Sequence, residues 1–138
     1  MTRRSAIVID ASVACKWFVE ETGTASAREV LAQALLADPG TWIGPELFHC
    51  EVLNAVRKAR PRTARLEEVA RFLASLPMRS VGFDAEIGSR IAAHAGKGVG
   101  VYDAFYAAVC DRHSAMLFTA DVRLCRALGA PSWVRLVA

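Results

Sequence analysis

The amino-acid sequence predicts an α/β fold with a single domain, in which a central parallel β-sheet is flanked by helices. Its 138 residues are enough for one domain with a sizeable core. Short apolar runs alternate with longer segments whose apolar residues recur at helical spacing, a pattern typical of parallel strands joined by crossover helices. No repeat, low-complexity tract or linker-like composition interrupts the chain, so we expect one domain over residues 1–138.

The first half of the chain is expected to contain two strands and four helices, with turn residues at their ends. Asp38-Pro39-Gly40 is a strong turn signal after the second helix. Pro45 is expected in the first turn of the third helix, Pro61 just after its end, and Thr63 as the cap of the fourth. The expected strands are 5–9 and 41–43, and the expected helices are 11–19, 22–37, 45–59 and 64–76.

The second half continues the alternation of strands and helices. Asp84 is expected to cap one helix, and the glycine-rich segment 96–100 is expected to form a flexible loop. Asp103 is expected to open a helix that is apolar all round and therefore buried. The expected strands are 78–83, 115–119 and 132–137, and the expected helices are 85–95, 103–113 and 121–128.

The composition predicts a cytoplasmic protein that does not cross a membrane. No apolar run approaches the ~20 residues that span a bilayer. The basic start resembles the beginning of a signal peptide, but the apolar run behind it stops at Asp10, too early for export. The net charge of +3 permits a polyanionic partner. The cysteines lack zinc-site spacing and lie in apolar helical patterns, which predicts buried free thiols. They are Cys15, Cys50, Cys110 and Cys125.

Four acidic residues stand where a parallel sheet would bring them together. Asp10 and Asp121 each follow an apolar run, and open parallel sheets bind ligands at the carboxyl ends of their strands. Asp103 opens the buried helix, and Glu51 interrupts the apolar side of another helix. Converging carboxylates without an interleaved Lys or Arg repel one another, and a divalent cation relieves that repulsion. The pattern therefore indicates a metal-dependent hydrolase.

Each of these acids also has a structural explanation. Asp103 and Asp121 are suited to cap the helices that follow them, whereas near Asp10 a hydroxyl at position 12 already offers a cap. Glu51 among apolar neighbours is costly unless it is paired or binds a cation. Alternatively, it lies at the edge of the apolar stripe, reaches water and pairs with Arg57 or Lys58.

Several neighbouring side chains are expected to support the acids. Ser12 places a hydroxyl beside Asp10, and the Thr119 hydroxyl can reach a carboxylate or a metal-bound water. Asn54 shares a helix face with Glu51 and could orient its carboxylate through a hydrogen bond. Two tyrosines are candidates for lining a pocket, although core packing is the simpler explanation for the second. These are Tyr102 and Tyr106.

The order of these motifs resembles that of the PIN-domain ribonucleases, in particular the VapC-type toxins of bacterial toxin–antitoxin modules. The matching segments are 7–13, 46–54, 101–108 and 118–121, which contain the four acids in order and span the chain. One position departs from the family's pattern, and at another the assignment of the acidic residue stays open. Ala11 stands where a second hydroxyl is usual, and Glu46 competes with Glu51 for the second acidic position.

The resemblance implies a Mg²⁺-dependent endoribonuclease that hydrolyses RNA phosphodiester bonds with a metal-activated water. One or two Mg²⁺ or Mn²⁺ ions are expected, with Asp10 and Asp103 as direct ligands. Glu51 and Asp121 are expected to bind metal directly or through water. The implied catalytic and metal-binding residues are thus Asp10, Glu51, Asp103 and Asp121, with Ser12, Asn54 and Thr119 in support.

The resemblance also implies a cognate VapB-like antitoxin, whose C-terminal peptide covers the active-site groove, and a homodimer. Trp17 and Phe18 offer an apolar surface for such a peptide, or else belong to the core of the domain. A basic segment could follow an RNA backbone, or it could be an ordinary solvated surface balanced by nearby Glu residues. This segment consists of Arg57, Lys58, Arg60, Arg62, Arg65 and Arg71.

The main alternative is a non-catalytic PIN-like module that binds RNA or a protein without cutting. Metal-dependent cleavage would distinguish the two. A phosphatase of the haloacid-dehalogenase type would require an acid at the position of Ser12. A chemotaxis-type receiver would require paired acids near the end of the first strand and a late lysine, and neither feature is present.

Overall fold

All five strands of the described chain run parallel, as the alternating pattern predicts. The computed structural model describes residues 5–59 and 65–138. In one sheet, β4 (Ala115–Thr119) lies between β1 (Ala6–Ile9) and β5 (Val134–Leu136). In the other, β2 (Ile43–Pro45) pairs with β3 (Arg79–Val81). A single bridge between Ile7 and Trp42 joins the two, so the order across the molecule is β3-β2-β1-β4-β5.

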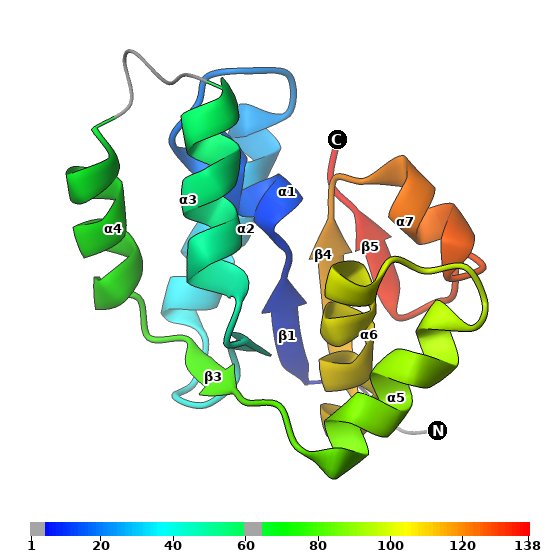
Figure 1. Cartoon of the computed structure of the whole chain (residues 1–138). Coiled ribbons are helices and arrows are strands. Elements are labelled where there is room, and N and C mark those ends of the chain that lie inside the picture. Colours follow the sequence, from blue (N-terminus) through cyan, green and yellow to red (C-terminus); the bar gives the residue numbers. More distant parts are fainter. Residues whose placement is uncertain (1–4, 60–64) are drawn as a thin grey trace.

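Helices lie on either side of the strands (Figure 1). The helices α1 to α4 gather on the β2–β3 side of β1, whereas α5, α6 and α7 gather on the β4–β5 side. They are α1 (Ala11–Ala14), the 3₁₀ helix η1 (Cys15–Trp17), α2 (Thr24–Leu36), α3 (Phe48–Ala59), α4 (Leu66–Ser75), α5 (Ala85–Ala95), α6 (Val101–His113) and α7 (Val122–Ala127).

Helix α6 is central to the core. Its residues 104–110 are all buried, and it packs against β1, β2, β4 and α5. This confirms the buried helix predicted from its apolar sequence. Because α6 runs alongside the strands in the opposite direction, its first turn is placed near the carboxyl ends of β1 and β4 (Figure 1).

Three helix starts differ from the expectation. Pro45 is the last residue of β2 rather than part of the first turn of α3, because the end of a strand also tolerates a residue without an N–H. Helix α6 begins at Val101, with Gly100 as its N-cap, so Asp103 does not cap it. Thr63 lies outside the described residues, and the N-cap of α4 is Arg65.

Several local predictions are confirmed. Asp84 caps α5, since its carboxylate accepts a hydrogen bond from the Ile87 N–H at 2.8 Å. Strand β4 has the predicted bounds. Trp17 belongs to the core, where its indole N–H donates to the Ala27 carbonyl at 2.8 Å. Phe18 is partly buried with its ring edge against Phe72.

The cysteine prediction is partly wrong. None of the four cysteines, all of which lie among the described residues, forms a disulfide. Cys15 and Cys110 are buried, but Cys50 is exposed on α3. The position of Cys50 on α3 lies beside the row of buried apolar residues of that helix rather than within it.

Among the described residues, no helix is long and apolar enough to pass through a lipid bilayer.

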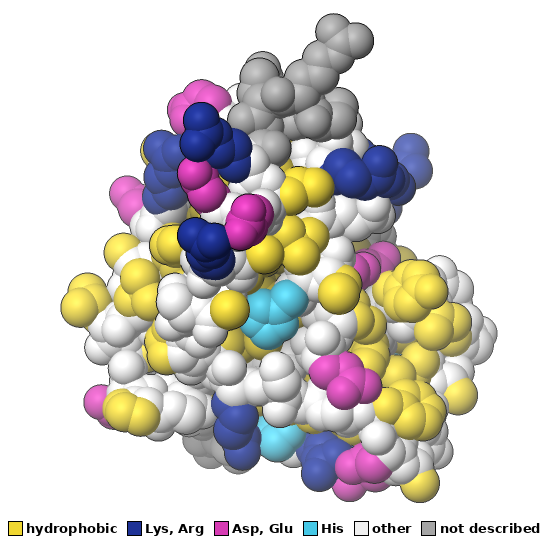
Figure 2. Space-filling view, turned by 60° about the vertical axis from the view of Figure 1, so that its left-hand side comes forward, with side chains coloured by type: hydrophobic (Ala, Val, Ile, Leu, Met, Phe, Trp, Pro, Cys, Tyr) yellow, Lys and Arg dark blue, Asp and Glu magenta, His cyan; other side chains and the backbone are white. Residues whose placement is uncertain are grey.

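The basic segment is largely balanced by acids where it lies on α4. Arg65 pairs with Glu68 at 3.2 Å, and Arg71 pairs with Glu67 at 2.6 Å. A view that brings α4 forward shows the corresponding mixture of basic and acidic side chains at its upper left (Figure 2). This part of the surface therefore fits an ordinary solvated helix surface better than a surface that follows an RNA backbone. Arg60 and Arg62 lie outside the described residues.

Candidate functional site

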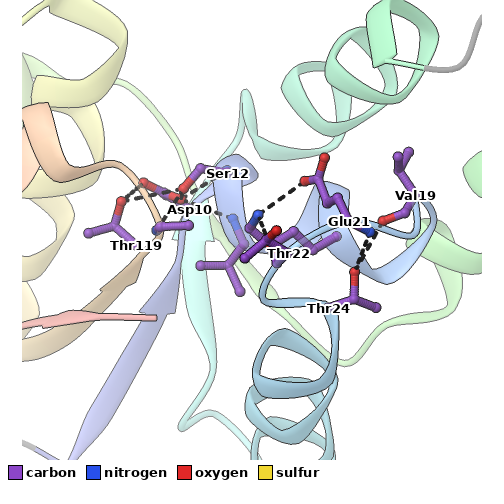
Figure 3. Close-up of polar contacts among 10 residues, drawn as sticks. Asp10, Ser12, Val19, Glu21, Thr22, Thr24 and Thr119 are labelled. Atoms are coloured by element: carbon purple, nitrogen blue, oxygen red, sulfur yellow. Dashed lines mark hydrogen bonds and ion pairs between the residues drawn. The ribbon is translucent and has the colours of Figure 1, made fainter. Parts of the chain in front are cut away.

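The carboxylate of Asp10 is held in place between the ends of β1 and β4. Its backbone N–H donates to the Phe118 carbonyl at 3.0 Å, which continues the pairing of the two strands. Oδ1 accepts hydrogen bonds from the Ser12 N–H at 2.9 Å and from the Ser12 hydroxyl. Oδ2 accepts from the Thr119 hydroxyl at 2.6 Å (Figure 3). Both oxygens of Asp10 are thus fixed by side chains from two different segments.

The two hydroxyls are in turn tied to the loop after β4. The Ala120 N–H donates to Ser12 Oγ at 2.9 Å, and the Asp121 N–H donates to Thr119 Oγ1 at 3.0 Å. Thr119 is fully buried. The structure therefore places Ser12 and Thr119 next to Asp10, in the positions that the sequence suggested for supporting residues. Asp10 itself also caps α1, so the structural explanation as a helix cap applies to this residue too.

Asp10 carries an unneutralised charge in a buried environment. It is 4% exposed, and none of the ion pairs among the described residues involves it. Burial raises the pKa of Asp10 from 3.8 to about 6, even though the hydrogen bonds from Ser12, Thr119 and Val13 act in the opposite direction. A bound cation would favour the ionised form.

Glu51 is fixed by a residue that is distant in sequence. The hydroxyl of Tyr106, on α6, donates to Glu51 Oε1 at 2.7 Å. Burial raises the pKa of Glu51, the Tyr106 hydrogen bond lowers it, and the charge of Asp103 raises it further. Glu51 is half-buried and forms no ion pair with Arg57 or Lys58 in the described chain, so the surface-pair alternative does not apply.

Two expectations around Glu51 need correction. Asn54 does not bond to Glu51 but accepts a hydrogen bond from Arg57 at 3.4 Å. Tyr106, which the sequence suggested for core packing, is indeed 1% exposed, yet its hydroxyl is the donor to Glu51. Its position three residues after Asp103, on the same helix face, is the signal that could have identified it. Glu46 is exposed, which favours Glu51 as the second acid.

Asp103 and Asp121 approach each other from two helix starts. Asp103 lies half-buried in the first turn of α6, where burial and then the charge of Asp121 raise its pKa. Asp121 is the N-cap of α7 and accepts from the N–H groups of Arg123 and Leu124 at 2.9 and 3.1 Å. The cap explanation is therefore confirmed for Asp121 and wrong for Asp103.

The four acids are electrostatic neighbours. Burial is the main cause of a raised pKa for the Tyr106 hydroxyl, followed by the charges of Glu51, Asp10 and Asp103. As the side chains stand, no three Asp, Glu, His or Cys of the described chain are close enough together to enclose a metal ion. Mg²⁺, however, commonly binds to one or two carboxylates and keeps several waters. An all-oxygen donor set without a neutralising Lys or Arg fits such a hard cation.

Comparison with known proteins gives the family. The model of the PIN domain matches residues 7–129, which include all four acids. No curated protein matches the chain. Among solved structures, a toxin–antitoxin complex from Klebsiella pneumoniae is similar in fold, with a TM-score of 0.70 and 16% identity, over 96% of this chain and 98% of that chain. PIN domains are generally nucleases and typically use divalent metal ions. The chain belongs to the PIN-domain family.

Proposed function

We propose that this protein is a VapC-type toxin of a toxin–antitoxin module, acting as a Mg²⁺- or Mn²⁺-dependent endoribonuclease. The observation that carries the proposal is the electrostatic influence of acids from separate segments on one another: the charge of Asp103 raises the pKa of Glu51, and the charge of Asp121 raises the pKa of Asp103. Burial raises the pKa of three of the four acids, Asp10, Glu51 and Asp103. The fold shared with a protein of a Klebsiella toxin–antitoxin complex is consistent with this role.

Asp10 and Asp103 would hold the metal directly, with Glu51 and Asp121 binding directly or through water. The bound metal would supply a polarised phosphate oxygen and an acidified water for in-line attack on an RNA phosphodiester, leaving a 5′-phosphate and a 3′-hydroxyl. The chain itself provides the positioning. Ser12 and Thr119 prevent rotation of the Asp10 carboxylate by donating to its two oxygens.

Tyr106 performs a similar task for Glu51. Its hydroxyl stabilises the ionised carboxylate through Oε1, and within the described residues the second oxygen accepts no hydrogen bond. That oxygen is free to face a cation or substrate. Since Asp10 has a pKa of about 6, the ionised form that a cation requires is populated above that pH. Metal affinity is therefore expected to rise as the pH increases through 6, and a bound cation should shift the midpoint of activity below that pH.

The partners follow from the same proposal. RNA is the substrate, a VapB-like antitoxin is the inhibitor, and a homodimer is the expected assembly in the cytoplasm. The burial of Trp17 in the core leaves it unavailable to an antitoxin peptide. The exposed residues around the acids, rather than the first helix, are the surface on which we expect RNA and antitoxin to compete.

Cleavage of a labelled pool of total tRNA and rRNA tests the proposal. The protein is incubated in Mg²⁺ or in EDTA, beside Asp103→Asn and a matched control, Asp111→Asn, at the other end of α6. Asp111 pairs with His94 at 2.7 Å and lies outside the acidic site. We expect discrete Mg²⁺-dependent fragments from the wild type and the control, and none from Asp103→Asn. RNA binding without cleavage under any metal condition would instead support the non-catalytic binding module.

A further inference from the structure

An aromatic ring is exposed directly beside the acidic site. Tyr102 is 70% exposed and its neighbour Val101 is 61% exposed, both in the first turn of α6. Asp103 is the next residue. Nothing in the packing of the described chain requires a large ring at this point, because the buried face of α6 begins at Ala104. A ring that faces solvent next to a candidate active site is suited to contact a ligand.

The ring forms one wall of a small cavity. The cavity has a volume of about 340 Å³ and is lined by Leu47, Cys50, Glu51, Asn54 and Tyr102. This volume is at the lower end of the roughly 300–1,000 Å³ typical of ligand pockets, which suits a single nucleoside. The wall combines apolar surface with the amide of Asn54, which offers both a donor and an acceptor, and with the carboxylate of Glu51.

We propose that this cavity holds one unpaired nucleobase of the RNA, stacked on Tyr102 and hydrogen-bonded at its edge by Asn54. This inference rests on the proposed function, since it names how that site recognises its substrate. Proteins that bind single-stranded RNA commonly stack bases on aromatic side chains and read their edges with polar groups. Asn54 is exposed, and within the described part of the chain its side chain is held only by a 3.4 Å hydrogen bond from Arg57, so its amide can turn toward a base.

The charge of the cavity selects among bases. Glu51 accepts at Oε1 from Tyr106, and its second oxygen can accept from a base N–H group. The exocyclic amino group of adenine, cytosine or guanine offers two N–H donors to this oxygen, whereas uracil offers the single ring N3–H. Because Glu51 belongs to both the cavity and the acidic site, a base held here places the adjoining phosphate next to the carboxylates. Tyr102 and Asn54 are thus positioning residues for the substrate.

Binding can be separated from cleavage by working in EDTA with the Asp10→Asn variant as parent. The probe is a six-nucleotide single-stranded RNA that carries 2-aminopurine at each position in turn. Adding Tyr102→Ala is expected to weaken binding by about 5- to 150-fold, the range of one base–aromatic stack. Tyr102→Phe should retain the affinity. Phe83→Ala is the matched control, since Phe83 is 66% exposed and lies outside the cavity.

The fluorescence of 2-aminopurine in the bound RNA distinguishes stacking on Tyr102 from a merely structural role of Tyr102. At one position, 2-aminopurine should be quenched by the parent and by Tyr102→Phe, and not by Tyr102→Ala. Equal affinity of the parent and Tyr102→Ala, or no RNA binding by the parent, would overturn the inference. If Tyr102→Ala cleaves the RNA pool like the wild type, this inference fails while the proposed function stands. If stacking depends on Tyr102 but no metal-dependent cleavage occurs, the proposed function fails instead.

Discussion

Replacing the buried Asp10 carboxylate with an amide is expected to stabilise the folded protein at neutral pH. Burial raises the pKa of Asp10 from 3.8 to about 6. Each pKa unit corresponds to about 1.4 kcal/mol, so keeping Asp10 ionised in the folded state costs about 3 kcal/mol at pH 8. Asparagine keeps the acceptor for Ser12 but loses the acceptor for Thr119, which costs about 1 kcal/mol. We therefore expect Asp10→Asn to be more stable than the wild type by roughly 1 to 2 kcal/mol.

The pH dependence of this difference is the decisive feature. Because the folded pKa is raised, the protonated form favours folding. Its contribution is fully present below pH 3.8 and is lost as the pH rises through about 6. The advantage of Asp10→Asn should consequently grow by about 1.4 kcal/mol between pH 5 and pH 8. Urea unfolding at both pH values, in EDTA, gives the two free energies of unfolding.

Asp111→Asn serves as the control, since Asp111 is paired with His94 and should gain nothing from losing its charge. The reasoning is refuted if Asp10→Asn is less stable than the wild type at pH 8. It is equally refuted if the difference between the two proteins stays the same from pH 5 to pH 8. Either result would mean that the Asp10 charge is compensated by its hydrogen bonds.

Three further changes follow from the same contacts. Thr119→Val removes a fully buried hydroxyl bonded to Asp10, and should lower the free energy of unfolding by about 2 kcal/mol in urea. Thr119→Ser keeps the hydroxyl and loses only a buried methyl group, which should cost about 1 kcal/mol. Tyr106→Phe removes the hydrogen bond that lowers the pKa of Glu51. Mn²⁺ affinity by calorimetry should then fall, and the loss should be greater at lower pH, because more of Glu51 is protonated. Asp84→Ala should lower the melting temperature through loss of both the α5 cap and the ion pair with Arg112, and Asp84→Asn, which keeps a capping oxygen, should lower it less.

The parts of the fold that depend on local sequence were predictable. The apolar runs before Asp10 and Asp121 predicted two parallel strands that end at the same edge, and β1 and β4 are paired neighbours. A run of buried residues predicted α6, and the carboxylate of Asp84 predicted the start of α5. In these cases, hydrophobic burial and capping point to the same structure.

Element ends were less predictable where one residue type serves two purposes. Proline suits the first turn of a helix and also the end of a strand, and at Pro45 the pairing with β3 decided the outcome. Asp103 looks like a cap, but the preceding Gly100 already occupies that position, so the carboxylate is free to face the other acids. Local propensity alone does not distinguish these alternatives.

The partner of Glu51 depended on tertiary packing. Asn54 was the natural candidate because it is one turn away on the same helix, yet its side chain is exposed and bonds to Arg57. The true donor, Tyr106, is 55 residues away and is brought to Glu51 by the packing of α6 on the strands. A contact at this separation leaves no periodic signal in a single sequence. Burying an aromatic ring with a hydroxyl nevertheless requires a partner for that hydroxyl.

The central claim is that these carboxylates bind a divalent cation, and Mn²⁺ titration tests it most directly. Binding is followed by calorimetry and by the paramagnetic resonance of free Mn²⁺, at pH 8, for the wild type, Asp103→Asn and Asp111→Asn. We expect saturable binding of one or two ions by the wild type and by Asp111→Asn, with affinity at least about tenfold weaker in Asp103→Asn. Equal binding by all three proteins, or no saturable binding by the wild type, would contradict the claim.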